Sequence, residues 1–517
     1  MVRTVAVIDI GTNSIRVNIA DIDAEGKVHP LDALNQPVSL GKDTFTSGII
    51  EKKTITQVID VLKGFRTVME QYHVTQPDQI RAVATSAVRE ARNSDAFLDR
   101  VYVATGISVT IIDAAEETRL TYQSIEPHIA ADPKLAATPT MVMEMGGGNT
   151  EVLVLQNKVV LYSHNYRFGS RRLREMLEKY RIVDARLRRL MERQVEVIVQ
   201  QLRQNVELTH APSIIILGGE ARHAAVQLLG EDDTADLAKI PVSALSKYVD
   251  EIMNHSVEDI VRKHKLLFPE AETLAPTLLA YVQTARAMKA KYLLVSKATM
   301  RDGLLVEMAT GGAWSDEFFG QIVRSAMDLG RKYQFDEAHA LHVATLCRTM
   351  FEVLRQEHRL DRRYGLLLHV AALLHEIGNF VNSQGHHKHS MYLILNSELF
   401  GMGQHDLLIT GLIARYHRRA EPQPVHEEYA ALDRESRLTV TKLAAILRVA
   451  DALDRGHLQR SRNITCTIQD GDFVIGIPEV DDLSLEQVAL HQKGSMFEDV
   501  YGMRVVLRKV QTPAVSA

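Results

Sequence analysis

The chain has 517 residues, of which 46% are hydrophobic and 24% are charged, an ordinary composition for a protein with three or four globular domains. Its net charge of −5 argues against nucleic acid as the main partner. The only cysteines, Cys347 and Cys466, are far apart, so the sequence predicts neither a disulfide framework nor a cysteine zinc site.

The N-terminal residues form an acid-bearing apolar strand pattern and lack the apolar core and cleavage site of a signal peptide. No uninterrupted apolar segment approaches the ~20 residues that cross a bilayer. We therefore expect a cytoplasmic protein without a membrane span.

The first 126 residues alternate between strand and helix patterns. A β-branched run at residues 5–8 predicts a buried strand, and residues 15–19 alternate as a second strand would. Apolar residues recur at helical spacing over 52–72. A strand at 80–84, a helix at 94–104 and a strand at 109–113 are expected next. This order is typical of an α/β domain.

Two glutamates, Glu116 and Glu117, follow the last of these strands, at the start of a helix expected to end near Glu126. Open α/β sheets bind ligands beyond the carboxyl ends of their strands, where this pair would lie. Acidic residues at a helix N-terminus also complement the helix dipole, which is a purely structural explanation. The position of the pair favours a functional role.

The stretch MVMEMGGGNTEVLVL, residues 141–155, predicts two short strands joined by a tight glycine loop. Glycines in such a loop let a phosphate lie directly on backbone N–H groups. Glu144 enters the loop and Glu151 leaves it, with Asn149 and Thr150 between them as side-chain donors. A simple glycine hairpin is the alternative interpretation of this stretch.

The N-terminal stretch TVAVIDIGTNSIRVNIADI repeats the same plan. At one constant offset, Asp9 aligns with Glu144, Gly11 with Gly146, and Ser14 with Asn149. A repeat at this long spacing suits a duplicated α/β domain rather than a solenoid. It predicts two phosphate loops that face each other across a cleft.

The second half opens at residue 140 and is expected to contain a long charged helix at 183–204. A strand, then Gly218 and Gly219, then a helix follow, an order that suits a phosphate-facing turn although a close strand–helix turn also needs glycine. Residues 296–308 are expected to form a strand end and a return helix that closes this half.

From about residue 313 the periodicity is helical, and we expect an all-helical domain up to about Gly456. Two alternating segments then flank an Asp470-Gly471 turn signal, and residues 503–509 can supply a further strand. The final residues, QTPAVSA, are expected to be frayed. Histidines are concentrated in the helical region: His339, His342, His375, His386, His387, His389, His405, His417 and His426.

Taken in order, the motifs of this chain resemble those of the Ppx/GppA family of exopolyphosphatases and guanosine pentaphosphate phosphatases. The motifs are DIGTNS at Asp9, ATSAVREARN at Ala84, EETRL at Glu116, GGGNTE at Gly146, GGEA at Gly218 and MRDGLL at Met300, with LLHEIG, HHKHS and RYHRR further on. The resemblance implies an α/β fold of the actin and sugar kinase type. Its implied parts are two ribonuclease H-like domains at 1–126 and 127–312, an all-helical HD-like domain at 313–456 and a small C-terminal α/β domain at 457–517.

This resemblance also implies an activity, in which water attacks the terminal phosphate of a phosphoanhydride chain with Mg²⁺ as cofactor. Glu117 would be the general base, Glu151 a second acid that orients the water, and Asp9 and Glu144 the carboxylates on the metal side. Phosphate would be bound by Thr12, Asn13, Ser14, Arg89, Gly146, Gly147, Gly148, Asn149 and Thr150. Glu144 and Asn149 stand where the family usually has Asp and Ser, and the longer carboxylate affects metal position and metal preference.

The helical region resembles the HD superfamily, in which a histidine, a His-Asp pair and a later aspartate bind metal. The matching residues here are His342, His375, Glu376 and Asp451, with glutamate in place of the paired aspartate. They form either a second metal site or a site that has lost its metal, and we favour the latter. In that case the histidines pack, form hydrogen bonds or line a polyphosphate path beside Arg415, His417, Arg418 and Arg419.

Inorganic polyphosphate is the expected substrate, and guanosine pentaphosphate is the close alternative within the family. The family also implies a homodimer. From another class, the chain could be an actin-like protein driven by nucleotide turnover or a sensor that binds alarmones or polyphosphate. The acid pair of EETRL and the absence of a recognisable adenosine pocket argue against the first. Complete catalytic carboxylates argue against the second.

Overall fold

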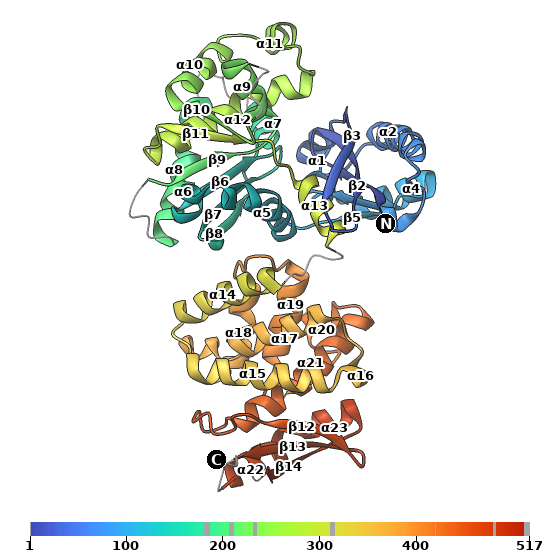
Figure 1. Cartoon of the computed structure of the whole chain (residues 1–517), viewed down its shortest axis with the longest axis vertical. Helices are drawn as coiled ribbons and strands as arrows, with labels where there is room; N and C mark the ends of the chain where they lie inside the picture. The colour runs from blue at the N-terminus through green and yellow to red at the C-terminus, as the bar shows by residue number, and fades with distance from the viewer. Residues whose placement is uncertain are drawn as a thin grey trace. The chain divides into compact units, whose positions relative to one another are not determined.

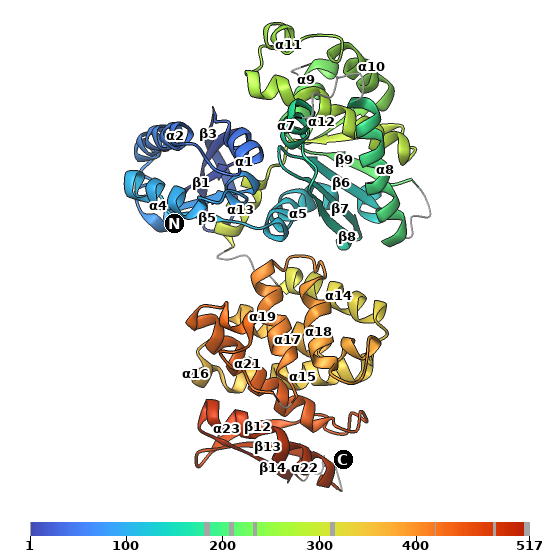
Figure 2. The same cartoon turned by 180° about the vertical axis from the view of Figure 1, so that it is seen from behind.

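The computed structural model describes residues 2–179, 187–205, 211–230, 235–310, 316–418, 420–478 and 482–510. The chain divides into two compact units, Met1–Ala313 and Trp314–Ala517 (Figures 1 and 2). This division lies beside the predicted boundary at residue 312. None of the described helices is long and apolar enough to cross a membrane.

The first lobe of unit 1 is built on a five-stranded sheet with the order β3-β2-β1-β4-β5. Its strands are β1 (Arg3–Ile10), β2 (Ser14–Ile22), β3 (Val28–Pro37), β4 (Ile80–Ala84) and β5 (Val109–Ile111). β1, β2 and β3 pair antiparallel, whereas β4 and β5 continue the sheet in parallel. The four predicted strands are confirmed. β3 was not predicted, because this edge strand exposes most of its residues and has no continuous apolar face.

The helices of the first lobe are α1 (Leu40–Ser47), α2 (Lys52–Gln71), the 3₁₀ turn η1 (Pro77–Gln79), α3 (Ser86–Arg89) and α4 (Ser94–Thr105). The periodicity that predicted α2 is that of its buried face, which includes Val58, Leu62, Phe65 and Met69. These side chains pack against buried residues of β1, β2 and β4 in one hydrophobic core.

The second lobe contains a six-stranded sheet with the order β10-β11-β9-β6-β7-β8. Its strands are β6 (Thr140–Met145), β7 (Thr150–Gln156), β8 (Val159–Tyr166), β9 (Ser213–Ile216), β10 (Leu237–Pro241) and β11 (Tyr292–Ser296). Its helices are α6 (Pro133–Ala137), α7 (Ser170–Lys179), α8 (Leu187–Asn205), α9 (Gly219–Leu229), α10 (Val242–Ile252), α11 (Val257–His264) and α12 (Phe268–Ala287). α8 corresponds to the predicted charged helix, whose predicted first residues lie outside the described part of the chain.

Two helices depart from the predicted division between the lobes. α5 (Ala114–Ala131) runs past Glu126, because Pro127 is accommodated inside the helix and the next helix begins only after Asp132. The predicted strand end at Ser296 and the helix after it are confirmed, but the prediction that this helix, α13 (Met300–Ala309), closes the second half was wrong. Its leucines, Leu304 and Leu305, pack against β1 and α5 instead and cover a face of the first sheet.

α5 and α13 lie side by side near the middle of unit 1 (Figures 1 and 2). Gly303 permits this close packing, because a Cβ at that position would collide with the backbone carbonyl of Leu120 on α5. The late segment of the second half therefore returns to the first lobe. It brings Arg301, at the start of α13, to the end of the first sheet.

Unit 2 is helical up to Leu453 and then ends in a small three-stranded sheet. The helices are α14 (Asp316–Lys332), α15 (Glu337–Val353), α16 (Arg355–His358), α17 (Arg362–Leu374), the 3₁₀ turn η3 (Ile377–Phe380), α18 (His386–Leu395), α19 (Gln404–Arg415), α20 (Glu427–Ala430) and α21 (Arg434–Leu453). They are followed by β12 (Thr465–Gln469), β13 (Asp472–Pro478), α22 (Ser484–Lys493), α23 (Ser495–Tyr501) and β14 (Arg504–Val510).

The predicted hairpin between β12 and β13 is confirmed. Asp470 and Gly471 both have positive φ, 51° and 83°, as a two-residue hairpin turn requires. β14 pairs in parallel with β13 at the position predicted for a further strand. The predicted fraying concerns residues 511–517, which lie outside the described residues.

Candidate active site

A cavity of about 160 Å³ lies in unit 1 between the β1–β2 loop of the first lobe and the β6–β7 loop of the second. The predicted site residues that line it are Asp9, Thr12, Asn13, Ser14, Glu117, Glu144, Gly146, Gly147, Gly148, Asn149 and Glu151. The fold thus brings both glycine loops and all four predicted carboxylates into one place.

The two loops are closed by the same hydrogen bond at matching positions. Gly11 N donates to Ser14 O at 3.0 Å, and Gly146 N donates to Asn149 O at 2.9 Å. These residues are the ones paired by the sequence repeat. The repeat therefore corresponds to two hairpins of the same construction, one in each lobe.

Several carbonyl oxygens of the two loops accept hydrogen bonds from backbone N–H groups of neighbouring segments. In the first loop, Thr12 O and Asn13 O accept from Gly41 N and Val38 N. In the second, Gly146 O and Gly147 O accept from the first residues of α7. Among the described residues, no acceptor is found for the backbone N–H groups of Thr12, Asn13, Gly147, Gly148 and Asn149. Successive N–H groups without acceptors form a concavity that binds anions.

The loops of the two lobes are in contact. A Cβ added to Gly147 would lie 2.6 Å from Thr12 Cγ2, and one added to Gly148 would collide with Ser86 Oγ. Thr12 Oγ1 and Ser86 Oγ are themselves 3.4 Å apart. Glycine is therefore needed here for close approach of the lobes, since any side chain would separate the two sets of N–H donors.

Glu117 projects into the cavity from the first turn of α5 and is held by Arg89, at the end of α3. Arg89 Nη1 donates to Glu117 Oε1 at 2.5 Å and to Ile112 O at 2.5 Å. Burial raises the pKa of Glu117 to about 7, against the opposing effect of Arg89, and Asp9 and Glu144 raise it further. A carboxyl group with this pKa can accept a proton near neutral pH.

Glu116, the neighbour of Glu117, is directed elsewhere. Its carboxylate lies 3.5 Å from the guanidinium groups of Arg81 and Arg119, and it does not line the cavity. The side chains of the two neighbouring glutamates of the EETRL motif therefore point to different places. Glu117 lines the cavity, whereas Glu116 contacts two arginines.

Glu144 and Glu151 are partly buried carboxyl groups on the two strands of the second hairpin, and both line the cavity. Burial is the largest cause of the raised pKa of each, and neighbouring carboxylates add to it. Glu151 accepts hydrogen bonds from Thr121 Oγ1 at 3.2 Å and Asn165 Nδ2 at 3.3 Å. Several carboxyl groups gathered in one cavity could hold a divalent cation, which prefers oxygen ligands.

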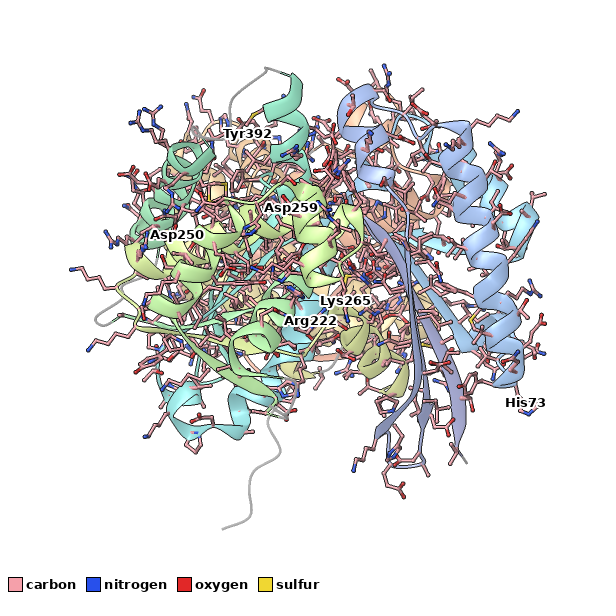
Figure 3. The ribbon with its side chains drawn as sticks, turned by 90° about the horizontal axis from the view of Figure 1, so that it is seen from above. His73, Arg222, Asp250, Asp259, Lys265 and Tyr392 are labelled. Atoms are coloured by element: carbon pink, nitrogen blue, oxygen red, sulfur yellow. The ribbon has the colours of Figure 1, made fainter. Side chains whose placement is uncertain are left out.

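Three arginines that received no role from the sequence also line the cavity: Arg16, Arg222 and Arg301. Arg301 Nη1 lies 3.2 Å and Arg16 Nη1 lies 3.6 Å from Asp9 Oδ2. Figure 3 shows Arg222, at the start of α9, on the side of the second lobe that faces the first. All three lie within or just after motifs that were recognised, and this proximity was the only signal in the sequence.

Two predicted phosphate ligands are placed differently from the expectation. Thr150 is fully buried and donates through Oγ1 to Phe168 O, so it fixes the end of the loop and does not face the cavity. Arg89 does not line the cavity either, because its guanidinium is engaged by Glu117 and Ile112 O. It contacts the Glu117 carboxylate instead.

In unit 2 the structure gathers a different set of histidines from the predicted one. His375, Glu376 and Asp451 belong to clusters of close potential metal ligands, together with His339, His386 and His417. His342 is in none of the clusters found among the described residues; His339, three residues earlier on α15, faces Asp454 on the C-terminal side of α21.

The polyphosphate path past these histidines stays a prediction. His417 is buried, and Arg415 is paired with Glu428 at 2.9 Å. Arg419 lies outside the described residues.

Comparisons with known proteins agree with this geometry. The model of the Ppx/GppA phosphatase family matches residues 18–311, and the model of Ppx/GppA phosphatase domain III matches residues 323–492. The chain belongs to the Ppx/GppA phosphatase family. Members of this family are phosphatases, and the predicted family is confirmed.

One curated Ppx/GppA relative is the guanosine-5'-triphosphate,3'-diphosphate pyrophosphatase of Photobacterium profundum, which is 22% identical over 98% of both chains. An exopolyphosphatase structure from Cytophaga hutchinsonii covers 60% of this chain and 100% of its own, with 20% identity and a TM-score of 0.54. An exopolyphosphatase-like protein covers 59% of this chain and 97% of its own, with 20% identity and a TM-score of 0.50. These likenesses confirm the α/β fold class for unit 1, while the HD-like assignment of unit 2 stays a prediction.

Proposed function

We propose that this chain is an exopolyphosphatase that hydrolyses the terminal phosphoanhydride of inorganic polyphosphate and releases orthophosphate. One observation carries the proposal: a partly buried glutamate, Glu117, whose pKa is about 7, lines the same cavity as two loops whose backbone N–H groups have no acceptor among the described residues. A phosphoanhydride carries dense negative charge, which such donors neutralise before water approaches.

Glu117 is the general base of the proposed reaction. Arg89 holds Oε1, which leaves Oε2 to take a proton from water as the water oxygen forms a bond to the terminal phosphorus. The bond from that phosphorus to the bridging oxygen breaks, and the shortened chain departs with the electron pair. A positioned carboxylate base typically contributes ~10²–10⁴-fold to the rate.

Mg²⁺ fits the carboxylates of the cavity. Asp9 and Glu144 would hold it, with Glu151 next to Glu144. Burial, and after it the neighbouring carboxylates, raises the pKa of both glutamates, and a cation would balance the charge of their ionised forms. When bound, the ion would supply positive charge for the phosphate oxygens. Asp9 would then exchange part of its present pairing with Arg301 and Arg16 for the ion.

The cavity volume favours a chain terminus over a whole nucleotide. About 160 Å³ is less than the roughly 300–1,000 Å³ of pockets that enclose drug-sized ligands. Guanosine pentaphosphate is nevertheless the second candidate, because the relative from Photobacterium profundum that matches along nearly the whole chain is named for that type of substrate. Its terminal phosphate would use the same cavity, with the nucleoside outside it.

The test is orthophosphate release by the full chain from long polyphosphate, short polyphosphate, guanosine pentaphosphate and ATP, with Mg²⁺. The proposal expects the highest kcat/KM on polyphosphate. A higher kcat/KM on guanosine pentaphosphate would establish the second candidate. Absence of release from all four substrates would contradict the hydrolase function itself.

A further inference from the structure

Arg222 differs from the other two arginines that line the cavity. Arg16 and Arg301 both lie close to Asp9, and Arg301 Nε also donates to Asn18 Oδ1 at 3.0 Å. Among the described residues, no hydrogen bond or ion pair is found for the guanidinium group of Arg222, although its side chain is partly buried. Its N–H donors are therefore available to an anion that enters the cavity.

The backbone that carries Arg222 is firmly placed. The turn between β9 and α9 passes through Gly218, which has a φ of 104°, and Arg222 N donates to Gly218 O at 3.2 Å in the first turn of α9. Tyr281 OH, on α12, donates to Leu217 O at 2.8 Å and accepts from Met145 N at 3.0 Å. One buried hydroxyl thus ties the end of β9 to the end of β6, which carries the second glycine loop.

The proposed base, Glu117, lies on the β7 side of Glu144. In the second sheet β6 lies between β7 and β9, with Glu151 on β7 and Glu144 on β6. Thr121, one turn after Glu117 on α5, donates to Glu151 at 3.2 Å. Residues four apart on a helix share a face, so Glu117 is placed beside Glu151.

Arg222 lies on the opposite side of Glu144, after β9. A Cβ added to Gly218 would lie 3.9 Å from Glu144 Oε1, so the turn before Arg222 borders this carboxylate. Glu220, which also lines the cavity, accepts a hydrogen bond from Thr273 Oγ1 at 2.8 Å and is held toward α12. The order across the cavity is therefore Glu117, Glu144 and Arg222.

This order gives a direction to the proposed reaction. Water approaches the terminal phosphorus from the side of its base, Glu117. In phosphoryl transfer the attacking and leaving oxygens are roughly in line, so the leaving oxygen lies on the far side of the phosphorus. The far side of this cavity is the side of Arg222.

We propose that Arg222 binds the penultimate phosphate of the substrate and stabilises the charge that develops on it during hydrolysis. This inference rests on the proposed hydrolase function. As the bond from the terminal phosphorus to the bridging oxygen breaks, the electron pair stays on that oxygen, and the guanidinium group supplies N–H donors and positive charge there. A guanidinium group can donate two parallel hydrogen bonds to one phosphate. Arg222 would thus favour phosphoanhydrides over phosphomonoesters, which have no second phosphate.

The first test compares the binding of two ligands to the full chain with Mg²⁺, measured by titration calorimetry. Orthophosphate occupies only the position of the terminal phosphate, whereas methylenediphosphonate adds a second phosphoryl group through a bridge that cannot be hydrolysed. Arg222→Gln should weaken methylenediphosphonate by at least about tenfold and orthophosphate by no more than about threefold, because only the second group reaches Arg222.

The second test measures turnover of long polyphosphate. Arg222→Gln should lower kcat by at least about a hundredfold, the usual effect of removing a donor to a developing oxyanion. Arg222→Lys should recover part of this loss, since lysine keeps the charge but not the paired donors. Arg262→Gln is the control, because Arg262 lies on the surface of the same lobe, 76% exposed and paired with Asp259. Circular dichroism establishes that each variant is folded, and Arg222→Lys carries the binding comparison if Arg222→Gln is not.

Equal weakening of both ligands, or of neither, would overturn the proposal, because a residue that only offsets the charge of Glu144 cannot distinguish them. A loss of turnover confined to guanosine pentaphosphate would also overturn it and would place Arg222 against the nucleoside. If the wild type releases phosphate from no substrate, the proposed hydrolase function fails. The binding comparison needs no turnover and still decides whether Arg222 binds a second phosphate.

Discussion

Glu144 and Glu151 lie directly opposite each other on β6 and β7, and both side chains line the cavity. At the matching position of the first lobe, Asp9 lies opposite Arg16, an oppositely charged pair with atoms 3.6 Å apart. Like charges placed directly opposite on a sheet are destabilising. The second hairpin therefore requires a proton or a cation that the first does not.

A dependence of stability on pH and Mg²⁺ follows. Because burial and neighbouring carboxylates raise the pKa of both glutamates in the folded state, the folded protein binds protons that the unfolded chain has released. In chelator, this contribution to stability is lost as the pH rises above the ordinary glutamate pKa, so Tm should fall between about pH 5 and about pH 8. Mg²⁺ should restore Tm at the upper pH. Calorimetry with and without Mg²⁺ measures both effects.

Glu144→Gln is the matching variant. It should raise Tm at pH 8 in chelator, reduce the effect of Mg²⁺ on Tm and raise the Mg²⁺ concentration needed for phosphate release. Glu70→Gln, at an exposed position on α2, is the control and should leave all three quantities unchanged. Full phosphate release in excess chelator would refute the role of the metal.

Glu117→Gln should lower phosphate release by at least about a hundredfold, because the amide cannot accept a proton from water. Binding of polyphosphate should persist, since the N–H groups of both loops are untouched. Glu116→Gln is the control, because Glu116 faces Arg81 and Arg119 and its loss should change turnover by no more than a few-fold. If the two variants were equally impaired, Glu117 would lose its assignment as the base.

Arg89→Met should move the acidic limb of the pH profile of kcat/KM upward. In the wild type the base must be deprotonated, so activity should rise with pH through about 7, the pKa of Glu117. Arg89 opposes the effect of burial on this pKa. Its removal should therefore raise the pKa of Glu117 and shift the acidic limb of the profile to higher pH. Arg92→Met, at an exposed position, should leave the profile unchanged. A higher KM with an unmoved limb would instead support the original prediction that Arg89 binds phosphate.

Sequence reasoning found the parts of this site that have a local pattern. The glycine loops were predicted because a strand, an acid, a glycine and small polar residues occur twice, and the structure closes both with the same Gly11–Ser14 and Gly146–Asn149 hydrogen bond. The Glu116–Glu117 pair was predicted because it follows a strand directly, and Glu117 was singled out from the pair by the family resemblance. In each case, chemistry and backbone geometry are encoded within a few residues.

What the sequence did not reveal depends on contacts between distant segments. The return of α13 to the first lobe places Arg301 beside Asp9, although the two residues are 292 positions apart. His339 rather than His342 faces the histidine cluster, because the side of α15 that carries His339 packs toward α21. The sequence alone does not distinguish the two residues, since both fit the same helical periodicity. Thr150 and Arg89 were given phosphate contacts by analogy, whereas their actual partners, Phe168 O and Glu117, are set by tertiary packing.

The contact between the two loops yields a last prediction. Gly147→Ala places a Cβ 2.6 Å from Thr12 Cγ2 and 2.8 Å from Thr12 Cβ, so the lobes must separate slightly. Displacing donors by a fraction of an ångström from the phosphate should reduce kcat/KM by about ten- to a hundredfold. Gly64→Ala is the control, because a Cβ there meets no atom within 4 Å, and activity should be unchanged.

The double variant Gly147→Ala with Thr12→Ser tests the cause of that loss. Serine removes Cγ2, the nearer of the two colliding atoms, and keeps the hydroxyl that lies 3.4 Å from Ser86 Oγ. It should recover part of the activity, while Thr12→Ser alone should have a small effect. Non-additivity of this kind is expected only for residues in contact. Strictly additive losses would show that Gly147 acts through its own backbone and that the packing of Gly147 against Thr12 does not position the phosphate donors.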